Sequence, residues 1–394
     1  MYLTSRLKKI MSLLLVSTML GNSPLFAQKK KAPIMGWSSW NNFRVNIDEK
    51  MIREQADAMV ASGLYDAGYR FINIDDGYFG GRDASGHLFS NNAKFPSGMK
   101  ALVDYIHSKG LKAGIYSDAG NNTCGSMWDK DANGVGSGMY GHINDDCNLF
   151  FKQWGFDFLK VDWCGGEKMG LNEEQAYTPI INAVKGIDSN IVFNICRWQF
   201  PGVWAIKKAD SWRISGDISA HFGSILKIID LDADLYKYES AGHYNDMDML
   251  QVGRGMSYDE DKSHFSMWCM LNSPLLAGND LRHMSKQTLE ILTNKEVIAL
   301  NQDPGYKQAM RLSAANDVEV WAKPLGAEGS KAKAVAILNR SDVETTFNLS
   351  SSALGIGAKS RLRDLWLHKD LGVIGKERRF SIPKHGIVVL KIID

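Results

Sequence analysis

Aspartate residues follow or end most of the strand-like segments in the first three quarters of the sequence. They are Asp75, Asp76, Asp118, Asp162, Asp217, Asp246, Asp248 and Asp280. The carboxyl ends of the strands of a parallel barrel meet at one mouth, where barrel enzymes hold their active sites. A single aspartate there is as readily explained as a helix N-cap. Because a ring of like charges is costly, however, the whole set predicts a functional site.

Two of these carboxylates have the features of a catalytic pair. Residues two apart on a strand point to the same side, so Lys160 should lie beside Asp162 and keep it anionic, as a nucleophile must be. Asp217 has no cation closer in sequence than Arg213, so we expect it to hold a proton and act as a general acid. Two carboxyl groups with separated pKa values are what glycoside hydrolysis requires.

Aromatic residues accompany the same strand ends, and they supply faces that pack against the C–H groups of sugars. They are Trp37, Trp40, Tyr78, Trp163 and Trp198. For each one, ordinary core packing is an equally good explanation. Together with the carboxylates they predict a carbohydrate site.

Strand-like and helix-like segments alternate from Ile34 to about Asn301. Asp48 can cap a helix that carries Met51, Ile52, Ala56, Met59 and Val60 on one face, and a second helix is expected over Met99–Lys109. Strands alternating with helices predict a parallel sheet, and eight of them predict a closed (β/α)8 TIM barrel over residues 28–305. The expected strands are Ile34–Trp40, Tyr69–Asp76, Lys112–Asp118, Phe156–Trp163, Ile191–Trp198, Ser211–Asp217, Asp246–Leu250 and Pro274–Asp280.

The remaining residues, 306–394, have a different pattern of short strands separated by turns, which predicts a small C-terminal antiparallel β-sandwich. The expected strands are Val318–Ala322, Ala334–Leu338, Thr345–Leu349, Arg361–Leu367 and Ile387–Ile392. This domain carries no cluster typical of a site. We expect a structural role against the flank of the barrel, with accessory glycan binding as the alternative.

Residues 1–27 have the basic start, the apolar run and the small-residue end of a secretory signal peptide. The mature protein is therefore expected to be exported, to the periplasm or the medium, where disulfides can form. Its five cysteines are an odd number, so at least one is unpaired within the chain. No later segment has the apolar length of a membrane span.

Composition and motifs exclude several other classes of function. The 394 residues carry a net charge of +2, whereas a nucleic-acid partner would require a strongly basic face. There is no CxxC pair, HExxH helix, phosphate-binding loop or nucleotide fingerprint. We therefore expect no metal and no cofactor. Nothing in the sequence specifies an oligomeric state.

Five segments, in order, resemble glycoside hydrolase family 27, the melibiase-type α-galactosidases. They are Gly36–Asn41 (GWSSWN), Asn73–Tyr78 (NIDDGY), Gly114–Asp118 (GIYSD), Leu159–Asp162 (LKVD) and Asn245–Met249 (NDMDM). The resemblance extends over nearly the whole mature chain. It implies a retaining exo-glycosidase that removes terminal α-galactosyl residues from an oligosaccharide or polysaccharide.

The resemblance also implies roles for individual residues. Asp162 would be the nucleophile and Asp217 the acid/base, with their carboxyl groups about 5–5.5 Å apart as in retaining enzymes. Cys124 and Cys164 would form a disulfide between the loops that follow the third and fourth strands. The sugar subsite would be formed by Trp37, Asp75, Asp76, Tyr116, Lys160, Arg213 and Asp248, with Arg197 and Trp198 from a further loop.

One departure from the family pattern bears on the sugar. The family usually has Cys-Glu-Trp where this chain has Cys196-Arg197-Trp198, in a loop that contacts the C2 substituent. β-L-Arabinopyranosides and α-N-acetylgalactosaminides are therefore alternative substrates for the same mechanism. Retention of Asp75 and Asp76 favours galactose. A catalytically silent carbohydrate-binding protein is the alternative from another class, and the presence of both Asp162 and Asp217 argues against it.

Overall fold

The computed structural model describes residues 32–393, so the expected signal peptide, residues 1–27, lies outside the described residues. Within them an eight-stranded parallel sheet runs in the order β10-β1-β2-β5-β6-β7-β8-β9. Its strands are β1 (Met35–Ser38), β2 (Phe71–Asn73), β5 (Lys112–Asp118), β6 (Phe158–Asp162), β7 (Val192–Ile195), β8 (Ser211–Arg213), β9 (Tyr244–Asp246) and β10 (Leu275–Ala277).

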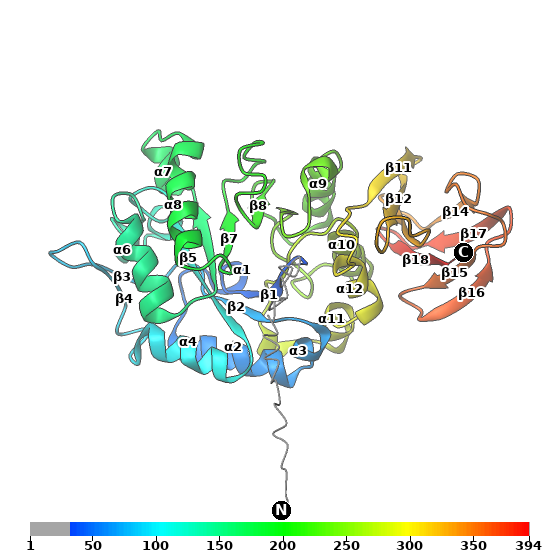
Figure 1. The fold of residues 1–394 in the computed structure, drawn as a ribbon. Helices are drawn as coiled ribbons and strands as arrows, with labels where there is room; N and C mark the ends of the chain where they lie inside the picture. The colour runs from blue at the N-terminus through cyan, green and yellow to red at the C-terminus, as the bar shows by residue number, and fades with distance from the viewer. Residues whose placement is uncertain (1–31, 394) are drawn as a thin grey trace, which may run out of the picture. The chain divides into compact units, whose positions relative to one another are not determined.

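The sheet closes on itself just beyond β9. Leu250 forms a parallel bridge with Ala277 of β10, and its backbone N–H donates to the carbonyl of Leu276 at 2.8 Å. This pairing completes the predicted TIM barrel. Helices surround the strands (Figure 1). The longer ones are α2 (Glu49–Ala61), α4 (Gly98–Ser108), the π-helix η2 (Asn148–Trp154), α8 (Glu173–Ile187), α9 (Phe222–Asp232), α10 (Tyr258–Met270), α11 (Lys286–Leu292) and α12 (Lys295–Asn301).

Local sequence signals account for two of these helices. Asp48 caps α2 by accepting a hydrogen bond from the backbone N–H of Met51 at 2.8 Å. The apolar face expected for α2 is buried except for Val60, which is 39% exposed, so that assignment was wrong. The predicted helix over Met99–Lys109 is present as α4, and it buries Met99, Leu102, Val103 and Ile106 along one face.

The eight predicted strands are all present, but most are shorter than expected. β8 ends at Arg213, before the loop that contains Gly216, so Asp217 lies on that loop instead of closing the strand. β9 ends at Asp246, where the predicted strand was to begin. Asp75, Asp76 and Asp248 also follow their strands, whereas Asp118 and Asp162 end β5 and β6. These acidic residues thus lie either at the last position of a strand or on the loop that follows it.

The C-terminal residues form the predicted antiparallel β-sandwich. A six-stranded sheet runs in the order β11-β12-β13-β18-β15-β16, and β14 pairs with β17. Valine, isoleucine and leucine side chains, among them Val335, Ile337 and Leu390, form its own core. The strands are β11 (Met310–Ala315), β12 (Val318–Pro324), β13 (Lys333–Asn339), β14 (Thr345–Ser350), β15 (Arg361–Asp364), β16 (Lys369–Val373), β17 (Glu377–Ile382) and β18 (Ile387–Ile393).

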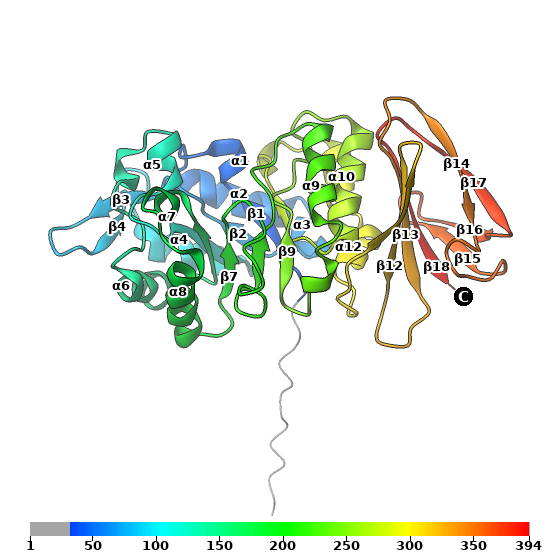
Figure 2. The ribbon, with the colours of Figure 1, turned by 90° about the horizontal axis from the view of Figure 1, so that it is seen from above.

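The sandwich packs against α10, which both ribbon views place beside it (Figures 1 and 2). The Ser263 hydroxyl of α10 donates to the carbonyl of His385 at 2.6 Å, and the Trp366 indole N–H donates to Ser266 at 2.9 Å. Lys323 of β12 is fully buried and donates to the carbonyl of Met270, the last residue of α10, at 3.2 Å. These contacts agree with a structural role for the sandwich.

Candidate active site

A cavity of about 370 Å³ opens at the carboxyl ends of the barrel strands. It is lined by aspartates that the sequence placed at this mouth, together with lysine, arginine and aromatic side chains. Residues from β1, β2, β5, β6, β7, β8 and β9, or from the loops that follow them, all contribute. The polar and aromatic lining includes Trp40, Arg44, Asp75, Tyr116, Trp128, Lys160, Asp162, Asn194, Trp198, Arg213, Asp217, Asp246 and Asp248.

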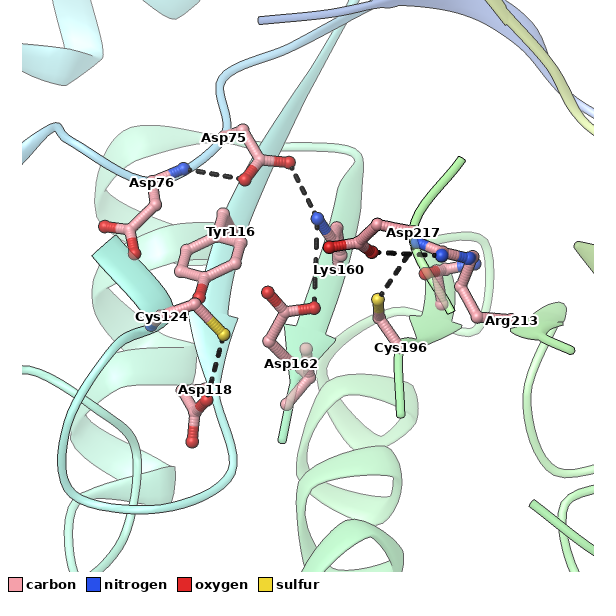
Figure 3. Close-up of polar contacts among 12 residues, drawn as sticks. Asp75, Asp76, Tyr116, Asp118, Cys124, Lys160, Asp162, Cys196, Arg213 and Asp217 are labelled. Carbon is pink, nitrogen blue, oxygen red and sulfur yellow. Dashed lines mark hydrogen bonds and ion pairs between the residues drawn. The ribbon is translucent and has the colours of Figure 1, made fainter. Parts of the chain in front are cut away.

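Asp162 ends β6 and lies beside Lys160, as the two-residue spacing predicts. The Lys160 ammonium is 3.8 Å from Asp162 Oδ1 and 3.0 Å from Asp75 Oδ2. Both carboxylates point toward that ammonium (Figure 3). Asp162 is only 5% exposed, and its Oδ1 accepts no hydrogen bond from protein. Among the described residues, the charge on Oδ1 is therefore balanced by the Lys160 ammonium and by no hydrogen bond.

Burial raises the pKa of Asp162 to about 6, because the positive charge of Lys160 only partly offsets the loss of water and the negative charge of Asp75. The carboxyl is still mainly ionised at pH 7. Cys196, whose state the sequence left open, is a buried free thiol that hydrogen bonds to Asp162 and helps to lower this pKa.

Asp217 lies on the loop after β8, and its side chain is 68% exposed. Arg213 Nη2 donates to Asp217 Oδ1 at 3.1 Å and is 2.7 Å from Asp248 Oδ2, so one guanidinium pairs with two carboxylates. Partial burial acts to raise the pKa of Asp217, but the charges of Arg213 and Lys160 outweigh it and hold the pKa below its ordinary value.

The protonation state expected for Asp217 is therefore wrong for the free molecule. The sequence suggested that Asp217 keeps its proton, because no cation is closer along the chain than Arg213. In the structure the loop folds back, so that Arg213 itself pairs with Asp217. A ligand that fills the cavity removes water from Asp217 and should raise its pKa. General-acid chemistry here would thus depend on bound substrate.

Tyr116 and Asp248 are fixed in the cavity wall by backbone contacts. The Tyr116 hydroxyl accepts from the backbone N–H of Cys124 at 3.1 Å. Asp248 accepts from the backbone N–H of Ile218 at 2.9 Å, and its own φ is +77°. That left-handed conformation costs free energy in a residue other than glycine, and the contacts with Ile218 and Arg213 hold Asp248 in it.

Three residues expected in the sugar subsite do not line the cavity. Trp37 is fully buried and its indole N–H donates to the carbonyl of Asn279 at 2.8 Å. Asp76 is also fully buried and accepts from the backbone N–H of Gly125 at 2.6 Å; its carboxylate points away from Lys160 (Figure 3). Burial raises the pKa of Asp76 to about 7.

Arg197, the third of these residues, turns away because Glu173, at the start of α8, forms an ion pair with its guanidinium. Trp198 takes the place in the wall instead, with a φ of +62°. Of the other rim aromatics that the sequence singled out, Trp40 lines the cavity, whereas Tyr78 and Trp163 are buried.

A disulfide joins Cys124 to Cys164, with the Cα atoms 5.2 Å apart, as the resemblance implies. It links the loops after β5 and β6, next to the end of the Asp162 strand. Asp118 lies within 4.8 Å of both sulfur atoms, a cluster of metal-ligating types. Because the two sulfurs are bonded to each other, neither is a thiolate that could bind a metal.

Arg44, Trp128 and Asn194 line the cavity although sequence reasoning did not select them. Asn194 Nδ2 donates to Asp246 Oδ2 at 2.8 Å and keeps that carboxylate in the wall. Asn194 lies on an expected strand, so its alternation could have indicated it. Arg44 follows the short helix α1 (Trp40–Phe43), and Trp128 ends another short helix, so neither lies on a strand and no sequence pattern pointed to them.

A family model described as "Alpha galactosidase A" matches residues 32–303, which hold the barrel and every lining residue. The chain belongs to this family, the melibiases. A second model, the α-galactosidase C-terminal β-sandwich domain, matches residues 315–392. The chain is thus a glycoside hydrolase of the α-galactosidase type.

Melibiase relatives match most of the chain in sequence and in structure. An α-galactosidase A from Cellvibrio japonicus is 41% identical over 97% of both chains. The crystal structure of α-galactosidase I from Mortierella vinacea superimposes with a TM-score of 0.82 at 31% identity, covering 92% of this chain and 97% of that one. The structure of an α-galactosidase from Saccharomyces cerevisiae with raffinose superimposes with a TM-score of 0.81 at 25% identity. The match covers 92% of this chain and 97% of that one.

Proposed function

We propose that this melibiase is an exported exo-enzyme that cleaves terminal α-D-galactosyl residues with retention of configuration, using Asp162 as nucleophile and Asp217 as acid/base. The observation that supports this most directly is that both carboxylates line one cavity, each beside a cation. Retention requires that the two carboxyl groups stand about 5–5.5 Å apart, which remains a prediction for this pair.

In the first half-reaction a carboxylate oxygen of Asp162 attacks the anomeric carbon while the bond to the leaving-group oxygen breaks. Asp217 donates its proton to that oxygen, so the leaving sugar departs as a neutral alcohol. A galactosyl ester on Asp162 remains. The buried position of Asp162 favours this step, because ester formation removes a charge that the surroundings solvate poorly.

In the second half-reaction water attacks the anomeric carbon and transfers a proton to Asp217, and Asp162 is released as a carboxylate. The negative charges of the two residues raise each other's pKa while both are ionised. Neutralising Asp162 as an ester therefore lowers the pKa of Asp217, which Arg213 already holds low. Asp217 is thereby kept as the anion that a general base must be.

Asp75 and Lys160 are the groups we assign to the galactose hydroxyls. Asp75 Oδ1 accepts from the backbone N–H of Asp76 at 2.9 Å, and Oδ2 accepts from Lys160 at 3.0 Å. The carboxylate is thus oriented before a sugar enters, and the Lys160 ammonium has a further hydrogen to donate. Asp76 helps to orient the Asp75 carboxylate through this backbone hydrogen bond.

Export is part of the proposal. It is supported by the leader-like residues 1–27 and by the disulfide between Cys124 and Cys164, which persists in oxidising compartments. Within residues 32–393, none of the helices has the length and apolar character needed to cross a bilayer.

A panel of nitrophenyl glycosides tests the proposed activity. We expect the native protein to hydrolyse the α-galactoside faster than the β-L-arabinopyranoside or the α-N-acetylgalactosaminide, and Asp162→Asn to hydrolyse none of them. A preference for either of the other sugars would correct the substrate. Failure of the native protein on every glycoside would favour the silent binding protein.

Removing the Lys160 charge should move the acidic limb of the pH profile. With α-galactosyl fluoride, whose leaving group needs no proton from Asp217, formation of the ester requires only that Asp162 be ionised, so kcat/KM on this substrate is expected to fall below about pH 6. Because Lys160 lowers the Asp162 pKa, Lys160→Met raises it, and the acidic limb shifts to higher pH. We expect the ratio of kcat/KM on the fluoride at pH 5.5 to kcat/KM on the fluoride at pH 7.5 to fall about five- to tenfold.

Lys100→Met is the matched control, since Lys100 is an exposed lysine that pairs with Asp104 on α4. Its pH profile should coincide with that of the native protein. If Lys160→Met lost the same factor at both pH values, Lys160 would act only in binding the sugar, and our account of the Asp162 pKa would be wrong.

A further inference from the structure

Trp128 is an aromatic side chain that borders the cavity and is left in solvent. It is 72% exposed, whereas Tyr116 in the same wall is 1% exposed. Single exposed apolar residues are common on protein surfaces. Trp128 differs from such residues because it lines the mouth of the active-site cavity and its backbone is anchored on both sides.

Trp128 is the last residue of the short helix α5 (Cys124–Trp128). The start of α5 is fixed by the disulfide to Cys164, and the Gly125 N–H donates to Asp76 Oδ2 at 2.6 Å. Asp76 therefore helps to hold the start of α5 in place at the mouth of the cavity. The indole is presented to solvent by a fixed backbone instead of a free loop, which lowers the entropic cost of binding a ligand there.

The residue after Trp128 fastens the other end of the segment. Asp129 accepts two hydrogen bonds from the Arg44 guanidinium, at 2.5 Å from Nε and 2.8 Å from Nη2. The same guanidinium lies 4.8 Å from the ring centre of Trp40. Arg44 thus ties α5 to the segment after β1 across the mouth.

Arg44 also connects this segment to the acid/base. Arg44 and Asp217 both line the cavity, and they lie close enough for the Asp217 charge to help raise the pKa of Arg44, after the larger effect of its hydrogen bond to Asp129. Asp217 is itself 68% exposed at the mouth, whereas Asp75 and Asp162 are buried inside. A leaving group protonated by Asp217 lies at the exposed end of the cavity, where Trp128 is also exposed.

We propose that Trp128 is a specificity-determining residue that binds the leaving-group sugar, the pyranose attached to the terminal galactose. The C–H face of that ring stacks on the exposed indole while the glycosidic oxygen lies at Asp217. This inference rests on the proposed function. It assigns this melibiase a preference for oligosaccharide substrates over galactosides whose leaving group has no ring.

Raffinose and α-galactosyl fluoride separate binding of the leaving group from binding of galactose. Both carry the same galactosyl group, but fluoride has no ring to stack on Trp128. For Trp128→Ala we expect the ratio of kcat/KM on raffinose to kcat/KM on the fluoride to fall about tenfold. Trp128→Phe keeps an aromatic face and should restore most of the ratio. Tyr236→Ala, which removes a 43% exposed aromatic that does not line the cavity, should leave it unchanged.

Two outcomes would overturn the proposal. An unchanged ratio in Trp128→Ala would show that the indole does not contact the leaving sugar. An equal loss on both substrates, with no recovery in Trp128→Phe, would give Trp128 a structural role in the mouth. A native protein inactive on both substrates would instead refute the proposed function itself, so the two failures are distinguishable.

Discussion

Asp162→Ala is expected to lower kcat on raffinose and on α-galactosyl fluoride by about 10⁴-fold or more, equivalent to roughly 5 kcal/mol of barrier. The loss should be the same for both leaving groups, because Asp162 forms the bond to the anomeric carbon in either case. Steady-state kinetics on the two substrates, corrected for spontaneous hydrolysis, provide the measurement.

The same substitution should leave the fold intact. Asp162 is a buried carboxylate with an unbonded oxygen and a raised pKa, so its charge costs free energy in the folded state. Lys160 remains paired with Asp75 at 3.0 Å. We therefore expect a thermal midpoint equal to or above that of the native protein. Asp234→Ala, at an exposed aspartate outside the cavity, should retain full activity. If the Asp162→Ala protein were unfolded, Asp162 would have a structural role.

Asp217→Ala should distinguish leaving groups by their need for a proton. On raffinose we expect kcat/KM to fall by about 10²- to 10⁴-fold, the usual contribution of a general acid. On α-galactosyl fluoride, whose leaving group departs without protonation, kcat/KM should fall far less. Turnover of the fluoride should then be limited by hydrolysis of the Asp162 ester, since the general base is also missing.

Azide provides a check on that interpretation of Asp217. As a small anion that needs no deprotonation, it can replace water in the second half-reaction and should accelerate turnover of the fluoride by Asp217→Ala but not by the native protein. Equal losses of kcat/KM on both substrates, with no acceleration by azide, would count against the acid/base assignment.

The fold could be predicted from the sequence where a single local pattern determines a helix or a strand. Lys112–Asp118 directly follows a glycine-ended helix and was predicted as a strand, and β5 has those bounds. The sandwich strands β11, β16 and β17 were missed because they bury little: β11 is exposed along its whole length, so its side chains carry no alternating pattern. Val60 fits the spacing of an apolar face on α2, yet packing against the barrel leaves it outside.

The site could be predicted for those residues whose positions follow from the ends of the strands. Strand ends and side-chain alternation suffice to bring Asp162 next to Lys160 and Asp75 into the same cavity. They do not describe loops. The pairing of Arg213 with Asp217, and the turn of Arg197 toward Glu173, depend on long-range contacts that no spacing encodes.

Covalent trapping tests the central assignment most directly. In a galactosyl fluoride with a second fluorine at C5, the added fluorine slows both half-reactions. The fluoride leaving group keeps formation of the ester faster than its hydrolysis, so the ester accumulates. Digestion and mass spectrometry should then locate one fluorogalactosyl group on the peptide containing Asp162, and Asp162→Asn should remain unlabelled. A label on any other residue, Asp217 included, would contradict the proposed mechanism.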